Sequence, residues 1–224
     1  MNEQYIFFDV GANNGDSSVP IIRKNPDARV YAFEPVPALV NYIKQQTKDY
    51  PNYVVTQTAV SDFNGTASFR ISGEPSKKEI QTFVDLDFHK FVEHNWHGCS
   101  SLLELSDNVL DSWYGRTDML VLEEIEVNVI RLDSFIQQNN IDHIDFLWVD
   151  TQGSDLNVLK GLGDYIHIVN SGTVEAANKP DILYKNQNSK EETIEYLKQC
   201  GFNDIRVSTN DPADNEVNIS FYRG

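Results

Sequence analysis

A short loop near the start of the chain constrains its fold more than any other segment. The loop follows an apolar run at residues 5–8, precedes a helical pattern from about Ser18, and reads Asp9-Val10-Gly11-Ala12-Asn13-Asn14-Gly15-Asp16. Such an apolar run is typical of a strand buried on both faces in a parallel sheet. Glycines directly after the strand let the backbone turn sharply and approach a ligand. Because open α/β sheets bind ligands at the carboxyl ends of their strands, the loop predicts a cofactor site.

Strand and helix patterns alternate along the rest of the chain. Further strands are predicted at residues 30–33, 53–55, 67–71, 125–129, 144–149 and 166–174, the last interrupted at Asn170-Ser171-Gly172. Asn64-Gly65 is a hairpin-turn signal ahead of the strand at 67–71. Helices are predicted to begin near Ser18 and Pro37, to follow Asp150, and to lie between Ser189 and Gly201.

The last two predicted strands, residues 205–207 and 217–221, form a terminal hairpin pattern. Strands that alternate with helices and end in a hairpin predict an α/β fold with a mostly parallel sheet and an antiparallel edge. The 224 residues suffice for one such domain and are too few for two, so we expect a single domain over residues 1–224.

The net charge and the composition limit the kinds of partner that we expect the chain to bind. The formal net charge of −16 disfavours phosphate backbones and anionic lipid, so we expect no nucleic-acid partner and no membrane partner. No apolar run approaches the ~20 residues that span a bilayer. The first residues lack a signal-peptide pattern, and Cys99 and Cys200 are expected to be reduced thiols, which together predict a cytoplasmic location.

The residues of the loop discriminate between two classes of cofactor. Dinucleotide-binding loops carry Gly-x-Gly-x-x-Gly, whose second glycine makes room for pyrophosphate. Here three other residues separate Gly11 from Gly15, and Asp9 adds a negative charge where a dinucleotide brings its own. S-adenosylmethionine carries a sulfonium and an ammonium group and no phosphate, so an acidic loop suits it electrostatically. The loop therefore favours S-adenosylmethionine over NAD.

Acidic residues at further strand ends extend the predicted cofactor site. Glu34 ends the second predicted strand, where a carboxylate can accept hydrogen bonds from both ribose hydroxyls. Asp62 is a candidate acceptor for the adenine amine, although a cap of the Asn64-Gly65 turn is an equal alternative. The predicted cofactor-binding residues are Asp9, Gly11, Ala12, Asn13, Gly15, Asp16, Glu34, Pro35, Asp62 and Asp150.

The order and spacing of several motifs resemble the FkbM family of methyltransferases along nearly the whole chain. Besides the loop, the motifs are Phe33-Glu34-Pro35, Ala59-Val60-Ser61-Asp62 with Gly65, Ser100-Ser101-Leu102, residues 131–135, residues 145–155, Leu159-Lys160-Gly161 and Cys200-Gly201-Phe202. The resemblance implies a Rossmann-like class I methyltransferase fold, with a seven-stranded sheet and helices on both faces. It also implies S-adenosylmethionine as cofactor and O-methylation of a sugar or natural product.

The resemblance also assigns roles within the site. It implies that Asp9, Gly11, Asn13 and Gly15 line the methionine end of the cofactor, with Glu34 on the ribose and Asp62 near the adenine. The family often shows Asp-Val-Glu-Gly-x-Glu where this chain has Asp150-Thr151-Gln152-Gly153-Ser154-Asp155. Gln152 removes a charge from that pattern and Asp155 shortens a side chain, which leaves the role of this segment open.

An alcohol needs a base to take its proton during methyl transfer. Asp150, at the end of a central strand, is the first candidate, and a purely cofactor-positioning carboxylate is the alternative. His97, close to His89 and His94, is the second candidate because histidine titrates near neutrality. Glu175 and Tyr184 are minor candidates. No metal site is predicted, since the histidine spacing matches no zinc signature, although magnesium assistance through Asp150 stays open.

Residues 73–124 have the weakest pattern and are expected to form an insertion that covers the acceptor. The expected acceptor is a hydroxyl of a sugar, a glycan precursor or another small natural product. Two other functions stay open: a non-catalytic S-adenosylmethionine-binding protein, supported by Gln152, and an NAD-dependent oxidoreductase, disfavoured by the missing second glycine. The sequence does not fix the oligomeric state.

Overall fold

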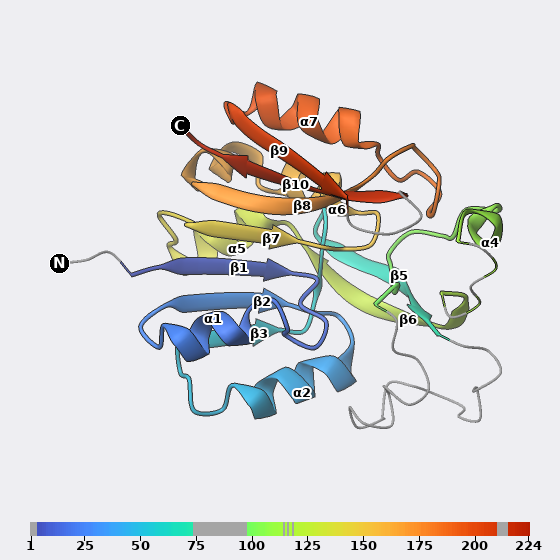
Figure 1. The fold of residues 1–224 in the computed structure, drawn as a ribbon. Coiled ribbons are helices and arrows are strands. Elements are labelled where there is room, and N and C mark those ends of the chain that lie inside the picture. The colour runs from blue at the N-terminus through green and yellow to red at the C-terminus, as the bar shows by residue number, and fades with distance from the viewer. Residues whose placement is uncertain (1–3, 74–97, 114, 116, 118, 210–214) are drawn as a thin grey trace.

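The computed structural model describes residues 4–73, 98–113, 115, 117, 119–209 and 215–224 (Figure 1). Its main sheet has seven strands in the order β3-β2-β1-β7-β8-β10-β9. The strands are β1 (Ile6–Val10), β2 (Arg29–Phe33), β3 (Tyr53–Thr56), β7 (Phe146–Val149), β8 (Ser171–Ala177), β9 (Asp204–Thr209) and β10 (Glu216–Tyr222). The first five in this order pair in parallel, and β10 pairs antiparallel with both β8 and β9. The expected seven-stranded sheet with an antiparallel terminal hairpin is confirmed.

Strand β1 lies at the centre because its side chains are apolar on both faces. Phe7 packs with the helices α1 (Val19–Lys24) and α2 (Pro37–Gln46) in one buried cluster. Phe8 packs in a second cluster, with the helices α5 (Leu132–Asn139), α6 (Asp155–Gly161) and α7 (Lys190–Gln199). The sheet therefore carries helices on both faces, as expected, and its strand ends at the carboxyl edge are left free for a ligand.

A second, three-stranded sheet lies beyond the carboxyl ends of β1 and β2 (Figure 1). It contains β4 (Ala59–Val60), β6 (Val121–Ile130) and β5 (Gly65–Ser72), with β6 in the middle. The hairpin predicted at Asn64-Gly65 is wrong, because β4 and β5 flank β6 instead of pairing with each other. The Asn64 side chain instead accepts from the Arg131 N–H (2.8 Å) and donates to Ser134 Oγ (3.0 Å), which ties the turn to α5.

The strand predicted at residues 166–174 is also corrected. Residues Gly163–Ile168 form a 3₁₀ helix, η2, and β8 begins only at Ser171. Gly172, which resembled an interruption, is the second residue of that strand. A Cβ on Gly172 would overlap the carbonyl oxygen of Leu147 and would stand 2.5 Å from Cζ of Phe221. The strand needs a glycine there because its neighbours leave no room for a side chain.

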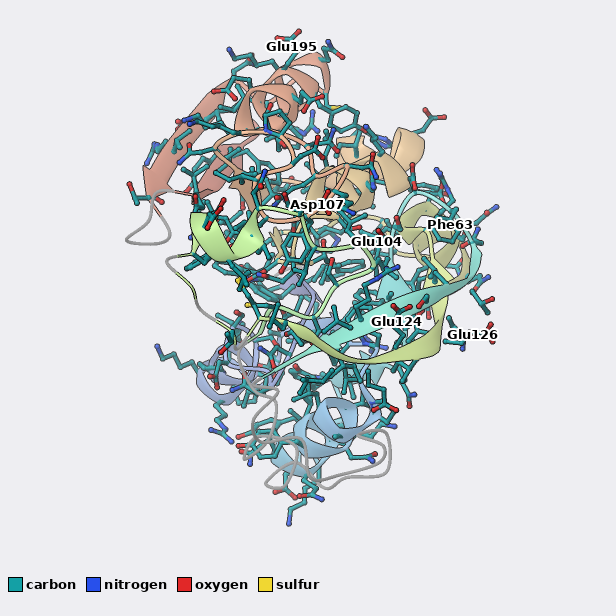
Figure 2. All side chains as sticks on the ribbon, turned by 90° about the vertical axis from the view of Figure 1, so that its right-hand side faces the viewer. Phe63, Glu104, Asp107, Glu124, Glu126 and Glu195 are labelled. Carbon is teal, nitrogen blue, oxygen red and sulfur yellow. The ribbon has the colours of Figure 1, made fainter. Side chains whose placement is uncertain are left out.

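Acidic side chains gather on the side of the molecule that carries the second sheet. Figure 2 shows Glu124 and Glu126 on β6, with Glu104 and Asp107 on the segment that leads to the short helix α4 (Val109–Ser112). Arg70 of β5 lies 3.4 Å from a carboxylate oxygen of Glu104 and 3.7 Å from one of Glu124. Within the described part of the chain, no helix is long and apolar enough to cross a membrane.

Candidate active site

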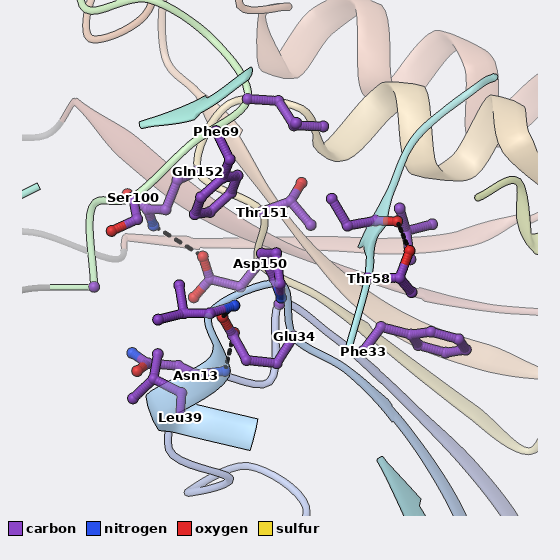
Figure 3. Close-up of a pocket in the computed structure, with 17 residues that line it drawn as sticks. Asn13, Phe33, Glu34, Leu39, Thr58, Phe69, Ser100, Asp150, Thr151 and Gln152 are labelled. Atoms are coloured by element: carbon purple, nitrogen blue, oxygen red, sulfur yellow. Dashed lines mark hydrogen bonds between the residues drawn. The ribbon is translucent and has the colours of Figure 1, made fainter. Parts of the chain in front are cut away.

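One pocket lies at the carboxyl ends of the central strands, where the second sheet meets the main one (Figure 3). Three chain segments that follow β1, β2 and β7 supply its polar wall. Residues of β4, β5 and α2 supply an apolar wall. The described lining is Gly11, Asn13, Phe33, Glu34, Pro35, Val36, Leu39, Thr58, Ala59, Val60, Phe69, Gly98, Ser100, Leu102, Asp150, Thr151 and Gln152.

The loop after β1 turns because two glycines adopt positive φ, +83° at Gly11 and +84° at Gly15. The N–H groups of Gly11 and Ala12 both donate to the carbonyl oxygen of Phe33, at 3.1 and 3.0 Å, so the loop crosses over the end of β2. A Cβ on Gly11 would overlap the carbonyl oxygen of Asp150, and a Cβ on Gly15 would stand 2.8 Å from Val19. Both glycines are therefore required by close approach as well as by backbone conformation.

Glu34 is fixed at the pocket wall by two backbone hydrogen bonds. Its side chain is 4% exposed; Oε2 accepts from the Asn13 N–H and Oε1 from the Val36 N–H, both at 2.8 Å (Figure 3). Burial raises the pKa of Glu34 to about 8, although the two backbone donors oppose the shift. A ligand that brings hydroxyl donors or positive charge to this carboxyl would favour its ionised form.

Asp9 lies behind the loop, completely buried. Its Oδ2 accepts from the Ser18 hydroxyl, whose oxygen is 2.6 Å from the Tyr53 hydroxyl. Its Oδ1 has no hydrogen-bond partner among the residues that the structure describes, and the same holds for Oδ1 of Asn13. Burial raises the pKa of Asp9 to about 7, and the nearby charge of Asp150 adds to the shift. Two buried acceptor atoms next to the pocket are thus left for a ligand or water to satisfy.

Asp150, which follows β7, presents a partly exposed carboxylate to the pocket. The Gln152 Nε2 donates to Oδ1 of Asp150 (2.9 Å) and to Oε2 of Glu175 (3.0 Å). The Tyr184 hydroxyl is 2.9 Å from Gln152 Oε1 and 3.0 Å from the Cys99 carbonyl oxygen, two acceptors that share its one proton. Burial raises the pKa of both Asp150 and Glu175. The structure thus brings the two minor candidates, Glu175 and Tyr184, into contact with the candidate base through Gln152.

Asp155 shapes the turn that carries Gln152. It is 3% exposed; Oδ1 accepts from the Thr151 N–H (2.7 Å) and Oδ2 from the Gly153 N–H (3.0 Å). Gln152 itself has a φ of +55°, a conformation that costs energy for a residue with a side chain. The two hydrogen bonds on either side of Gln152 hold this conformation. Burial and the charge of Asp150 raise the pKa of Asp155 to about 7.

The structure brings together only part of the predicted cofactor site. Gly11, Asn13, Glu34, Pro35 and Asp150 line the pocket. The described lining does not include the remaining five predicted residues: Asp9, Ala12, Gly15, Asp16 and Asp62. Of these five, the first three are buried in or behind the loop, and the last two are exposed.

Two further predicted residues, Asp62 on the cofactor side and His97 on the acceptor side, have different outcomes. The backbone carbonyl of Asp62 accepts from the Arg131 guanidinium (2.6 Å), so this residue contacts the start of α5, and its expected place near the adenine gains no support. His97, with His89 and His94, lies outside the described residues. Among the described residues, no group of three or more His, Cys, Asp or Glu side chains is arranged to hold a metal ion.

Sequence reasoning missed the apolar wall, formed by Val36, Leu39, Val60 and Phe69. For Val36 and Leu39 a signal existed, because they follow directly on Glu34 and Pro35 and so share the end of β2. For Phe69 no local signal existed, because its position depends on the second sheet, which the sequence pattern did not separate from the first.

Comparison with known proteins decides the family. Residues 9–203 match the family of the methyltransferase FkbM domain. The chain belongs to this family. It is 24% identical over 157 residues to the 2-O-methyltransferase NoeI of Sinorhizobium fredii, and 29% identical over 168 residues to the AMB antimetabolite synthetase AmbE of Pseudomonas aeruginosa. These alignments cover 70% and 71% of the chain, but only 56% and 8% of the two relatives.

Among solved structures, the CMeT domain of the citrinin polyketide synthase is similar, with a TM-score of 0.50 and 8% identity. The similarity covers 98% of this chain and 46% of that one, and at this identity it bears on the fold alone. The family match confirms the resemblance to FkbM methyltransferases, and the sheet order together with this structural similarity confirms the Rossmann-like fold.

The family and the fold indicate S-adenosylmethionine as the cofactor, and the residues of the pocket fit it. Glu34 offers a carboxylate for ribose hydroxyls, and Leu39 and Phe69 offer apolar surface for a base. Asp150 lines the pocket and the buried Asp9 lies behind the loop; a sulfonium and an ammonium group bound beside these acids would favour their ionised forms.

Proposed function

We propose that the chain is an O-methyltransferase that acts on a hydroxyl of a sugar, a glycan precursor or another small natural product. One observation carries the proposal: the pocket wall that holds Glu34 also holds Asp150, a partly exposed residue whose carboxyl pKa is raised because the surrounding protein desolvates it. A hydroxyl needs a base for its proton, and a carboxylate works best in this role when its pKa is shifted toward neutrality. The 2-O-methyltransferase named among the relatives supports transfer to oxygen.

Each lining group then has a distinct task. When bound, S-adenosylmethionine supplies an activated methyl group. Glu34 binds the ribose hydroxyls with the two carboxylate oxygens that Asn13 and Val36 already orient. Asp150 accepts the proton of the acceptor hydroxyl through the part of its carboxylate that faces the pocket. Most of the catalytic effect is expected from placing the acceptor oxygen in line with the methyl carbon.

The acceptor side of the pocket includes residues of the segment expected to cover the acceptor. Gly98, Ser100 and Leu102 of residues 73–124 line the pocket, which supports that expectation for the described part of the segment. Strand β6 begins at Val121, so the segment ends before residue 124. The comparisons leave a nucleic-acid acceptor open, and the net charge of −16 supports a small acceptor.

Binding calorimetry with S-adenosylmethionine and with NAD tests the cofactor part. We expect micromolar binding of S-adenosylmethionine, loss of that binding in Glu34→Ala, and no binding of NAD. Glu126→Ala, which removes an exposed carboxylate on β6, is the matched control and should bind normally. Folded protein that binds NAD instead would overturn the proposal.

Transfer of a radiolabelled methyl group to a panel of glycosides, oligosaccharides and hydroxylated small molecules tests the reaction. We expect transfer to at least one class of hydroxyl acceptor, and a loss in Asp150→Asn on the order of 100-fold or more. Cofactor binding without transfer to any panel member would favour a non-catalytic binding protein. Transfer that is unaffected in Asp150→Asn would remove Asp150 from the role of base.

A further inference from the structure

Glu175 is a buried acid that the proposed function does not yet use. It is 3% exposed and lies on β8, next to the strand that ends at Asp150. Its Oε2 accepts from the Gln152 Nε2, which donates a second hydrogen bond to Asp150. One amide nitrogen thus bridges the two carboxyl groups at the edge of the pocket, with an oxygen of each within 3.0 Å of it.

Two carboxyl groups bridged by one amide nitrogen cannot both be ionised without a large cost, so such a pair shares a proton. Burial raises the pKa of both groups, and because Glu175 is 3% exposed whereas Asp150 is partly exposed, we assign the proton to Glu175. Among the residues that the structure describes, the other titratable groups that interact with Glu175 are Asp155 from the turn after β7, Glu216 from β10 and the Tyr184 hydroxyl. None of these groups is a cation, so they too disfavour a charge on Glu175.

We propose that Gln152 holds Asp150 and Glu175 as a proton-sharing carboxyl pair, in which Asp150 faces the acceptor and Glu175 keeps the shared proton. Gln152 and Glu175 are positioning residues, since they act through Asp150. The role of the pair in methyl transfer rests on the proposed function. The sharing of the proton is a property of the free protein and can be measured without an acceptor.

The proton balance of the pair follows from its charge. Before reaction the pair holds one proton and one negative charge. As the new C–O bond forms, the acceptor O–H bond breaks and its electrons stay on oxygen, while the electrons of the broken S–C bond stay on sulfur. The released proton adds to Asp150, so the pair then holds two protons and no charge. One proton later leaves through the exposed side of Asp150, which restores the starting state.

The pair explains why an amide stands at position 152. A single amide nitrogen carries two N–H donors, and here each meets one carboxyl group. A glutamate at this position, as the family resemblance leads one to expect, would add a third acid and remove both donors. The Tyr184 hydroxyl meets the remaining amide oxygen, which fixes the orientation of the amide. Gln152 thus suits a site in which one amide bridges two acids.

Infrared spectroscopy of the free protein tests the pair. The spectrum is recorded above the pKa values of Asp9, Asp155 and Glu34, so that these acids are ionised. We expect one remaining band of a protonated carboxyl group that shifts in D₂O. Labelling the glutamate carboxyl groups of the wild-type protein with ¹³C should shift the band. Such a shift assigns the band to a glutamate without any substitution. The band should disappear in Glu175→Gln and persist in Glu195→Gln, an exposed acid on α7 (Figure 2).

The contacts of the pair are tested by two further variants. In Asp150→Asn the band should vanish at a lower pH than in wild type, because a neighbouring negative charge is gone. In Gln152→Leu the band should change frequency, because Glu175 loses an N–H donor. The proposal of a proton-sharing pair would be overturned if the labelled wild-type protein showed no glutamate band. It would also be overturned if neither variant altered the band.

The test separates the pair from the proposed function. Failure of S-adenosylmethionine binding or of methyl transfer leaves the infrared result unchanged, because that result concerns the free protein. Conversely, intact methyl transfer without the glutamate band would remove the pair and leave the proposed function standing. Circular dichroism of each variant confirms that the spectra come from folded protein.

Discussion

Gly11 and the carbonyl group of Asp150 are packed so closely that position 11 has no room for a Cβ. This contact joins the loop after β1 to the turn after β7, and both segments line the pocket. The two therefore cannot move independently. The cofactor loop and the turn that carries the candidate base thus form one packed unit, joined at a glycine that the sequence predicted as a cofactor-binding turn residue without indicating this contact.

Gly11→Ala tests this unit. The new methyl group must displace the Asp150 backbone, and the residue must keep a φ near +83°. We expect a loss of unfolding free energy of about 3 kcal/mol or more, together with a loss of S-adenosylmethionine affinity. Chemical denaturation measures the first and calorimetry the second.

Gly115→Ala is the matched control, since Gly115 has a φ of +75° and, among the described residues beyond its chain neighbours, no atom lies within 4 Å of the position of a Cβ. It should cost only the backbone strain of about 1–2 kcal/mol and leave cofactor affinity unchanged. Equal losses of unfolding free energy in Gly11→Ala and Gly115→Ala would show that the Asp150 backbone moves aside at little energetic cost.

The raised pKa of Glu34 predicts a stability that falls as pH rises. The ordinary value is 4.5 and the folded value is about 8, so between them the folded protein holds a proton that the unfolded chain has lost. The unfolding free energy therefore decreases with rising pH across this window, by up to about 1.4 kcal/mol per pH unit for one such group. Asp9 and Asp155, both with a pKa of about 7, act in the same direction.

Denaturation series between about pH 5 and about pH 8 measure this slope. Glu34→Gln should flatten the slope by the contribution of one group, even though its overall stability changes. Glu126→Gln, on the exposed face of β6, should leave the slope as in wild type. A wild-type stability that rises across this window would contradict the buried, proton-holding state of Glu34.

Cofactor binding near neutral pH should release a proton. Ribose hydroxyls that donate to Glu34 stabilise its carboxylate, whose pKa in the free protein is about 8. Calorimetry in two buffers with different ionisation enthalpies should therefore give different apparent heats for wild type. The difference should be smaller in Glu34→Gln wherever binding is still measurable. Identical heats in both buffers would argue that Glu34 keeps its charge state on binding.

Ser18→Ala should destabilise the protein by about 1–3 kcal/mol, because it removes the hydroxyl that donates to the fully buried Asp9. The same loss should raise the pKa of Asp9 further, since this hydrogen bond lowers it. Tyr53→Phe is the comparison, because it keeps the bond between Ser18 and Asp9 and removes only the outer hydroxyl. If denaturation gave equal losses of unfolding free energy for Ser18→Ala and Tyr53→Phe, the result would indicate that Asp9 accepts a hydrogen bond from another donor in Ser18→Ala.

Local signals in the sequence predicted much of the fold. The capping box at Ser189 and Glu192 forms as expected, with Glu192 Oε2 accepting from the Ser189 N–H at 2.8 Å. The loop after β1 and Glu34 also lie at strand ends, as their patterns indicate. These features depend on residues close together in the sequence, or on a rule that holds for every parallel sheet.

Features that depend on distant residues were not predictable. The link from Gln152 to Glu175 spans 23 residues and that to Tyr184 spans 32. The alternating strand at β5 gives no sign that its partner is β6 in a separate sheet. Gly172 resembled a break because its reason, the crowding by Leu147 and Phe221, comes from two other strands. Pairwise packing of this kind leaves no periodic trace in a single sequence.

The place of β1 in the sheet also sets the order in which the protein can fold. Phe8 pairs with Tyr31 on one side and with Leu147 on the other, so one neighbour of β1 is synthesised soon after it and the other much later. Until β7 emerges from the ribosome, the edge of β1 that will receive it stays open to wrong partners. Closing so long a loop slows folding, and the pocket forms only after this step. A nascent chain therefore gains no help from its cofactor until β7 and the turn after it have been made.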